Sequence, residues 1–261
     1  MLESNNDETT VRSVRRALAV LRAFRAGDRA LPLGEIAARA SLDKGTARRL
    51  LRTLIAERLI EQDEAGASYT LGTGVLELAA GVTPCEDLRQ SAQPVLAGIA
   101  QATGATTFLG VVHDGAALCI ARVDGEHPIQ IRAWSIGGRM PLNGGAGPRV
   151  LLAFLPDLLR ARILAAPLAR LTATTPTDPA ALEQHLALIR ARRWELGVDD
   201  VVEGIVSIGV PVCDAEGRAV ATISLAGLTS HMLEEGEPRW LGALRDGARL
   251  LEMRLGYRGT C

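Results

Sequence analysis

Residues 42–51, which read LDKGTARRLL, decide the fold of the first part of the chain. Asp43 is a good N-terminal cap, so a helix is predicted over Lys44–Leu59. Its apolar residues recur at helical spacing and turn inward, which leaves a polar face outward. The outward residues expected to contact DNA are Lys44, Thr46, Arg48, Arg49 and Arg52. Such a cationic helix fits the major groove, where arginine hydrogen-bonds guanine or phosphate.

Two more helices are predicted before this segment. Apolar residues recur every three or four positions over Val11–Ala26, and Val14 and Leu18 are expected to face the core. Pro32 can occupy the first turn of a second, shorter helix, which ends near Ser41. A short turn joins that helix to the cationic helix, so the two form a helix-turn-helix.

A wing is predicted directly after the cationic helix. Residues 59–62 and 68–71 read LIEQ and SYTL, and they flank the glycine-containing turn DEAGA. Two short strands around such a turn indicate a β-hairpin. Since a wing reaches the backbone of the DNA beside the groove, Ser68 and Tyr69 are expected to contact DNA.

Charge is divided unevenly along the chain, although the formal net charge is only −1. Residues 11–62 hold twelve cationic side chains against five acidic ones, whereas residues 63–261 hold 17 against 22. A basic segment on an acidic remainder is typical of a protein in which one domain binds a polyanion and the other does not.

Composition limits the class of protein. The 261 residues, 48% hydrophobic and 23% charged, are those of a globular chain with one large or two modest domains. An uninterrupted apolar run of about 18 residues is missing, so no membrane partner is expected. The chain begins MLESNNDE, which is acidic where a signal peptide needs cations. The protein is therefore expected in the cytoplasm.

The remainder of the chain predicts an α+β domain. The domain boundary is placed at Pro84, which is expected to break helical continuity, so that residues 1–84 include the start of a linker helix and residues 85–261 form the second domain. The predicted helices are Glu86–Thr103, Val150–Leu155, Leu158–Leu164, Pro179–Leu196 and Pro238–Leu255. The predicted strands are Thr106–His113, Ala117–Val123, Ile129–Trp134, Ile205–Cys213 and Ala219–Ala226. Hairpins with helices around them favour α+β over a parallel Rossmann sheet.

Several segments resemble the IclR family of bacterial transcriptional regulators. SVRRALAVL (13–21), LGEIAARA (33–40), LDKGTARRLL (42–51) and YTLG (69–72) are similar to its DNA-binding domain. GGRMPLNGGAGPRVLLA (137–153), GIVSIGVPV (204–212) and ATISLAG (221–227) are similar to its effector domain. The resemblance implies a winged helix-turn-helix followed by an α+β, GAF-like effector-binding domain, in a ligand-responsive repressor or activator.

The resemblance also implies where a small metabolite, an organic or aromatic acid, is held between the sheet and a glycine-rich loop. The implied residues are Asn143, Ala146, Gly147, Asp200 or its neighbour Asp199, Ser207, Ser224 and Ala226. Loop N–H groups and strand hydroxyls can bind a carboxylate without a metal. Arg149 could also pair with an anionic ligand, or it could form a surface or interdomain salt bridge.

Enzymatic activity, cofactors and metal ions are not expected. The segments around Ser135 and Ser207 lack the first glycine of a G-x-S-x-G nucleophile elbow, and Lys44 is the only lysine, so no Walker motif exists. The four histidines and four cysteines are dispersed, without an HExxH or CxxC spacing, which excludes a recognisable zinc site or disulfide framework.

The expected partners are a double-stranded DNA operator, a small effector and further copies of the chain. One recognition helix reads only a few base pairs, so a homodimer, and further a dimer of dimers, is expected on a palindromic operator. The alternative is a sensor or protein-interaction module whose winged helix binds a partner protein. Salt separates the two, because binding to several phosphates weakens steeply with ionic strength.

Overall fold

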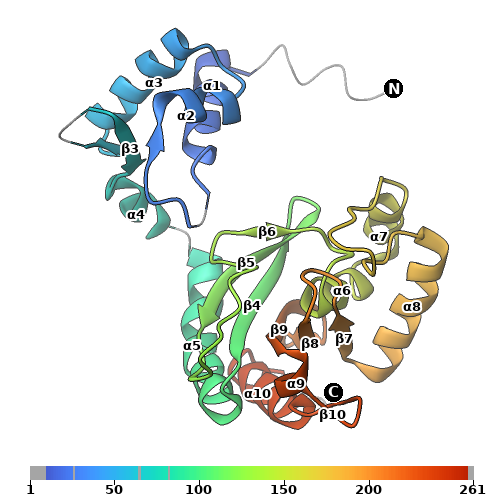
Figure 1. Ribbon diagram of the computed structural model, residues 1–261. Helices are drawn as coiled ribbons and strands as arrows, with labels where there is room; N and C mark the ends of the chain where they lie inside the picture. Colours follow the sequence, from blue (N-terminus) through green and yellow to red (C-terminus); the bar gives the residue numbers. More distant parts are fainter. Residues whose placement is uncertain (1–9, 26, 64–65, 82, 258–261) are drawn as a thin grey trace. The chain divides into compact units, whose positions relative to one another are not determined.

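The computed structural model describes residues 10–25, 27–63, 66–81 and 83–257. The chain divides into two compact units, Met1–Thr83 and Pro84–Cys261, which Figure 1 colours from blue to green and from green to red. Each unit buries a separate set of apolar side chains. A hydrophobic core of its own is the property that defines a domain.

Three helices and a small sheet build the first unit. The helices are α1 (Arg12–Arg22), α2 (Leu33–Arg39) and α3 (Lys44–Ala56), and a short α4 (Gly74–Ala79) follows the sheet. The antiparallel strands lie in the order β1 (Leu31–Pro32), β3 (Ser68–Leu71) and β2 (Ile60–Gln62). The α2–turn–α3 pair and the β2–β3 hairpin form the predicted winged helix-turn-helix.

Three details of the first unit differ from the predictions. Val14 and Leu18 are 54% and 43% exposed, because the stripe of α1 that faces the core is centred on Val20. Helix α3 ends at Ala56, before the predicted end, since Arg58 has a φ of 58° and turns the chain into β2. Pro32 ends β1 and precedes α2, instead of lying in its first turn.

A six-stranded antiparallel sheet forms the centre of the second unit. Its order is β6-β5-β4-β9-β8-β7, and every neighbouring pair is antiparallel. The strands are β4 (Thr106–His113), β5 (Ala116–Val123), β6 (Arg139–Met140), β7 (Glu195–Val198), β8 (Ile205–Cys213) and β9 (Ala219–Leu228). This arrangement confirms the α+β prediction.

The two faces of this sheet are covered by different helices. On one face, α5 (Thr83–Thr103) and α10 (Leu241–Arg254) bury Leu96, Leu244 and Leu251 against Ile208 and Ile223. On the other face lie α6 (Ala146–Ala153) and α8 (Pro179–Arg192), with α7 (Asp157–Leu164) beside them. Side chains alternate along a strand, so Ser224 faces α6 because its neighbour Ile223 faces α5 and α10.

Several predicted elements of the second unit were wrong. Ile129–Trp134 forms no strand in the described chain; it crosses the face of the sheet, where the Trp134 ring packs on Gly110 so closely that a Cβ there would lie 2.4 Å from it. Helix α8 stops at Arg192, and Glu195 begins strand β7, because Arg193 adopts a left-handed conformation with a φ of 58°. Pro84 lies within the first turn of α5 and does not break it.

The remaining boundaries shift by a few residues. Helix α6 begins at Ala146, four positions before the predicted Val150. A small hairpin, β10 (Leu233–Glu234) and β11 (Glu237–Pro238), follows the short helix α9 (Thr229–Met232), so α10 starts at Leu241 instead of Pro238. Because α6 begins at Ala146, the glycine-rich loop before it leads directly into the N-terminus of α6, and the backbone N–H groups of this first turn lie beside the sheet.

Candidate functional site

The start of α3 is fixed by a helix cap. The Oδ1 atom of Asp43 accepts a hydrogen bond from the backbone N–H of Thr46 at 2.8 Å. This bond is stronger to the ionised carboxylate than to the protonated group, so it lowers the pKa of Asp43. The cap therefore sets where the exposed face of α3 begins, as the sequence predicted.

The cationic residues of α3 are available to a ligand. Lys44, Arg48, Arg49 and Arg52 are exposed, and none of them has an ion-pair partner within the described chain. By contrast, Arg39 on α2 is held by Asp28 and Glu35. Thr46 is half-buried at the first turn of α3. These four unpaired cations lie on the helix that the sequence assigns to the major groove.

The two predicted wing residues, Ser68 and Tyr69, form hydrogen bonds within the β2–β3 hairpin. The Ser68 hydroxyl donates to Oδ2 of Asp63 at 2.8 Å, and hydrogen bonds from Ser68 and Ala67 lower the pKa of Asp63. Tyr69 is only 6% exposed, and its hydroxyl accepts a hydrogen bond from Nε2 of Gln62 at 3.1 Å. Tyr69 therefore packs in the core of the unit, with only a small part of its surface exposed.

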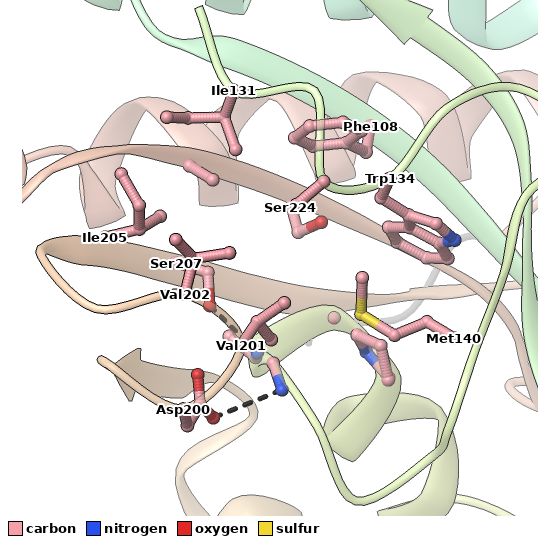
Figure 2. A pocket seen from close by; sticks show the side chains of 16 residues that line it. Phe108, Ile131, Trp134, Met140, Asp200, Val201, Val202, Ile205, Ser207 and Ser224 are labelled. Carbon is pink, nitrogen blue, oxygen red and sulfur yellow. Dashed lines mark hydrogen bonds between the residues drawn. The ribbon is translucent and has the colours of Figure 1, made fainter. Parts of the chain in front are cut away.

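A small, largely apolar cavity lies between α6 and the face of the sheet (Figure 2). Six of the seven implied effector residues line it: Ala146, Gly147, Asp200, Ser207, Ser224 and Ala226. Its remaining wall comes from residues that the sequence did not single out: Phe108, Ile131, Ala133, Trp134, Met140, Gly145, Pro148, Val201, Val202 and Ile205.

Two glycines allow the end of α6 to approach the sheet. A Cβ at Gly209 of β8 would lie 2.9 Å from the backbone nitrogen of Gly147, and a Cβ at Gly147 would lie 2.8 Å from Oγ of Ser224. Real Cβ atoms do not come so close to other atoms. The helix N-terminus can therefore rest on the strands only because neither position carries a side chain.

Few polar groups reach this cavity, and two of them are hydroxyls. Ser207 Oγ accepts a hydrogen bond from the N–H of Ala146 at 3.0 Å, which leaves its own proton to donate. Ser224 is 4% exposed, and its hydroxyl has no hydrogen-bond partner among the described residues. The N–H of Gly147 likewise has no acceptor there. These donors, at the positive end of a helix, favour an anionic group.

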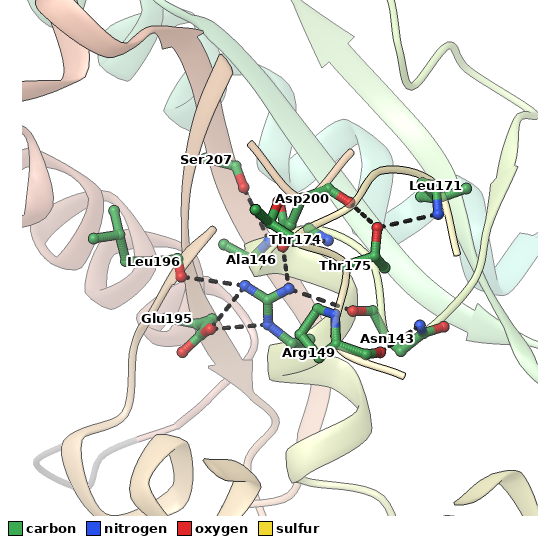
Figure 3. Close-up of polar contacts among 12 residues, drawn as sticks. Asn143, Ala146, Arg149, Leu171, Thr174, Thr175, Glu195, Leu196, Asp200 and Ser207 are labelled. Atoms are coloured by element: carbon green, nitrogen blue, oxygen red, sulfur yellow. Dashed lines mark hydrogen bonds and ion pairs between the residues drawn. The ribbon is translucent and has the colours of Figure 1, made fainter. Parts of the chain in front are cut away.

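Asn143 and Arg149 have structural roles instead. The Asn143 amide donates to the carbonyls of Ala169 and Pro176 at 2.7 and 2.8 Å, and it lies outside the cavity. Arg149 is 3% exposed and lies within the second unit, not at its surface. Its guanidinium donates to Glu195, Asp200 and the carbonyls of Asn143 and Leu196 (Figure 3).

This ion-pair network supports the floor of the cavity. Asp200 pairs with Arg149 and also accepts the N–H of Gly145 at 3.1 Å. Glu195, 1% exposed, binds Arg149 together with Arg192 and the imidazole of His185. Because the arginine already neutralises Asp200, that carboxylate does not present an unpaired negative charge to an anion in the cavity.

Both units match one protein family. Residues 13–64 match the IclR helix-turn-helix domain, and residues 81–253 match the domain described as bacterial transcriptional regulator IclR C-terminal. A winged helix-turn-helix joined to a small-molecule cavity defines the class of ligand-responsive transcriptional regulators. The chain belongs to the IclR family, whose members are regulators and not enzymes.

Known relatives and solved structures match nearly the whole length of this chain. The glycerol operon regulatory protein of Streptomyces griseus is 34% identical over 94% of this chain and 97% of its own. The regulator XynR of Escherichia coli is 30% identical over 95% and 98%. A crystal structure of an IclR homolog from Microbacterium hydrocarbonoxydans, complexed with 4-hydroxybenzoate, is 26% identical over 93% and 98% of the two chains, with a TM-score of 0.82.

Among the described residues, none of the helices is long and apolar enough to cross a bilayer. The same residues contain no group of three or more histidine, cysteine, aspartate or glutamate side chains that could hold a metal ion.

Proposed function

We propose that this regulator senses a small monocyclic aromatic acid in the α6 cavity and thereby alters the affinity of its winged helices for an operator. Residues 1–84 are proposed as the DNA-binding domain with the start of the linker helix, and residues 85–261 as the effector domain. The observation that carries the proposal is the unpartnered Ser224 hydroxyl, buried beside the N-terminus of α6 in a cavity with aromatic walls.

The lining favours a flat apolar body with one anionic end. Phe108 and Trp134 have ring centroids 5.9 Å apart, and Ile131, Met140 and Val201 fill the walls around them. A carboxylate is proposed to accept hydrogen bonds from Ser207, Ser224 and the N–H of Gly147. The 4-hydroxybenzoate bound by the Microbacterium homolog has this chemistry, which supports the same class of effector here.

A thermal-shift titration of the full chain tests the effector class. Benzoate and 4-hydroxybenzoate are compared with succinate, which has the charge without the ring, and with phenol, which has the ring without the carboxylate. A ligand at about 100 times its dissociation constant stabilises the folded state by about 2.7 kcal/mol. We expect the aromatic acids alone to raise the melting temperature; an equal response to phenol would contradict the role of the hydroxyls.

The proposed DNA contacts are Lys44, Thr46, Arg48, Arg49 and Arg52 of α3, with Ser68 supporting the wing. The exposed, unpaired guanidiniums of α3 support this assignment. The alternative, a winged helix that binds a partner protein, is disfavoured by the family to which the chain belongs. Loss of operator affinity by orders of magnitude between about 50 and 200 mM salt would support DNA binding through several phosphates.

A homodimer is proposed, and helix α1 offers a surface for it. Val11, Val14 and Leu18 are 63%, 54% and 43% exposed, and they recur at helical spacing along one side of α1. Such an apolar stripe on a surface helix is typical of a helix that packs on another. Sedimentation of the full chain tests this proposal, with Val14→Glu expected to weaken association. The protein is also proposed to act in the cytoplasm, where its DNA operator lies.

A further inference from the structure

A second hollow of the effector unit lies away from the α6 cavity and is lined by arginines. It is a groove formed by the C-terminal end of α8, strand β8 and helix α10. Its lining residues are Ala191, Arg192, Arg193, Val210, Pro211, Arg245, Ala248, Arg249 and Glu252. The groove shares none of its lining with the cavity proposed for the effector.

The floor of the groove exists because β7 is shorter than β8. The pairing of β7 with β8 runs from Glu195↔Gly209 to Val198↔Val206, so β8 continues past β7 from Val210 onward. Pro211 lies in this continuation and has no N–H to offer to another strand. An open recess is therefore left at this edge of the sheet, between two helices, instead of a further strand.

Arginines outnumber carboxylates in the lining of the recess. Four guanidinium groups and a single carboxylate, that of Glu252, line it, although residues 63–261 as a whole carry more acids than bases. Glu252 is 3% exposed and accepts the backbone N–H of Cys213 at 2.8 Å. Like charges repel one another, so a cluster of this kind is most stable when an anion lies among them.

Part of the cluster is held in place by neighbouring groups. Arg192 donates to Glu195 and to the carbonyl of Trp194, and its guanidinium lies 4.4 Å from the centre of the Trp194 ring. The Arg193 guanidinium lies 5.2 Å from the centre of the Phe154 ring. Fixed guanidiniums lose little conformational entropy on binding, which favours affinity for a ligand.

The α10 side of the groove supplies the least neutralised cations. Arg245 has no carboxylate within ion-pair distance among the described residues, and it donates only to the carbonyl of Arg192 at 3.3 Å. Arg249 pairs with Asp246 at 3.3 Å, but both side chains are mostly exposed. Exposed ion pairs of this kind contribute little to stability, so Arg249 can readily leave Asp246 for an anion that binds it better.

We propose that this groove binds a small phosphate-bearing molecule, as a second ligand site of the regulator. Arginines from the end of α8 and from α10 flank the recess on two sides, and guanidinium groups bind tetrahedral phosphate through paired hydrogen bonds. Arg192 is already paired with Glu195, so Arg245 and the exposed, exchangeable Arg249 are the cations that the groove offers to a phosphate. The groove is thus chemically distinct from the apolar cavity that is proposed for the aromatic acid.

Calorimetric titration of the full chain with inorganic phosphate, at constant ionic strength set with sodium chloride, tests the proposal. Expected is saturable binding with one site per chain, at least about tenfold weaker in Arg245→Ala and in Arg249→Ala. Arg162→Ala is the matched control, because it removes one exposed arginine from α7, outside the groove. This variant should bind as the wild type does. Phosphate affinity should also persist in Ser224→Ala, which separates this site from the effector cavity.

Three results would overturn the proposal. The first is the absence of saturable binding at millimolar phosphate. The second is wild-type binding by both groove variants, provided that their melting temperatures show them folded; since Arg249 is 63% exposed, its removal leaves the core intact. The third is a loss of operator affinity in the groove variants without phosphate, which would make the groove part of a DNA surface.

Discussion

Gly147 lies directly against Ser224: a Cβ atom at position 147 would come within 2.8 Å of Oγ and 3.2 Å of Cβ of that serine. The hydroxyl can rotate away, but the Cβ atom of a strand residue cannot, so β9 and α6 would have to move apart. The contact ties the helix N-terminus to the strand that supplies the unpartnered hydroxyl, and it makes position 147 sensitive to a single methyl group.

Gly147→Ala is therefore expected to weaken effector binding by about tenfold or more, which corresponds to about 1.4 kcal/mol. Operator affinity without effector should stay at the wild-type value, since α3 is untouched. Gly242→Ala in α10 is the control, because no atom lies within 4 Å of its added methyl group. A folded Gly147→Ala protein with wild-type affinity for 4-hydroxybenzoate would rule out the close fit described here.

Arg149→Ala should strongly destabilise the effector unit. Removal of the guanidinium leaves Asp200 and Glu195, 4% and 1% exposed, without their shared cation, and breaking a buried pair in this way costs about 3–5 kcal/mol. Arg218→Ala, on a side chain that is 72% exposed, is expected to change stability by less than about 0.5 kcal/mol. Urea unfolding of both variants gives the comparison; equal effects would remove the network from the account.

Arg48→Ala and Arg49→Ala should each reduce operator affinity and lower the slope of log affinity against log salt by about 1 if a phosphate contact is lost. Tyr69→Phe should keep that slope, because its hydroxyl is engaged by Gln62 and its ring lies in the core. Arg162→Ala, from the other unit, controls for the change in net charge. Fluorescence anisotropy with labelled operator at several salt concentrations measures all four; an altered slope in Tyr69→Phe would restore the wing tyrosine as a phosphate contact.

The buried thiol of Cys119 is predicted to lower the stability of the effector unit at alkaline pH. Burial raises the pKa of its thiol to about 12, above the 9.0 of an exposed cysteine. An acid whose pKa is higher in the folded state favours unfolding once the unfolded chain ionises, so stability should fall as pH rises above 9.0. The loss amounts to about 1 kcal/mol near pH 10. Cys119→Ala should lack this part of the pH dependence in urea unfolding; parallel pH profiles would contradict it.

The DNA-binding unit could be predicted from the sequence because local signals agree there. The cap at Asp43, the spacing of cationic residues on α3 and the turn after Gln62 all act within a few residues, and the structure confirms them. The burial of Tyr69 could not be predicted, because alternation in a short strand does not show which face meets the core. That choice depends on packing against Leu31 and Val20, which lie far away in the sequence.

The effector cavity was only half predictable. Ser207, Ser224 and Ala226 were implied by the family resemblance, and they share a face of the sheet because Ser207 pairs with Ala226 and Ser224 lies two positions before Ala226 on the same strand. Trp134 and Ile131 were assigned to a strand because their segment is apolar, yet they line the cavity from a loop. The partners of Arg149 were also hidden, since Glu195 and Asp200 meet it only when β7 takes its place at the edge of the sheet.

The most direct test of the central claim is operator affinity with and without 4-hydroxybenzoate, measured by anisotropy for the wild type and Ser224→Ala. An effector acts only through unequal affinity for two arrangements of the protein, and such coupling usually changes affinity by about 5- to 150-fold. We expect a change in this range for the wild type and none for Ser224→Ala, with equal operator affinities of the two proteins in the absence of ligand. The same response in both proteins, or a difference between them without ligand, would contradict it.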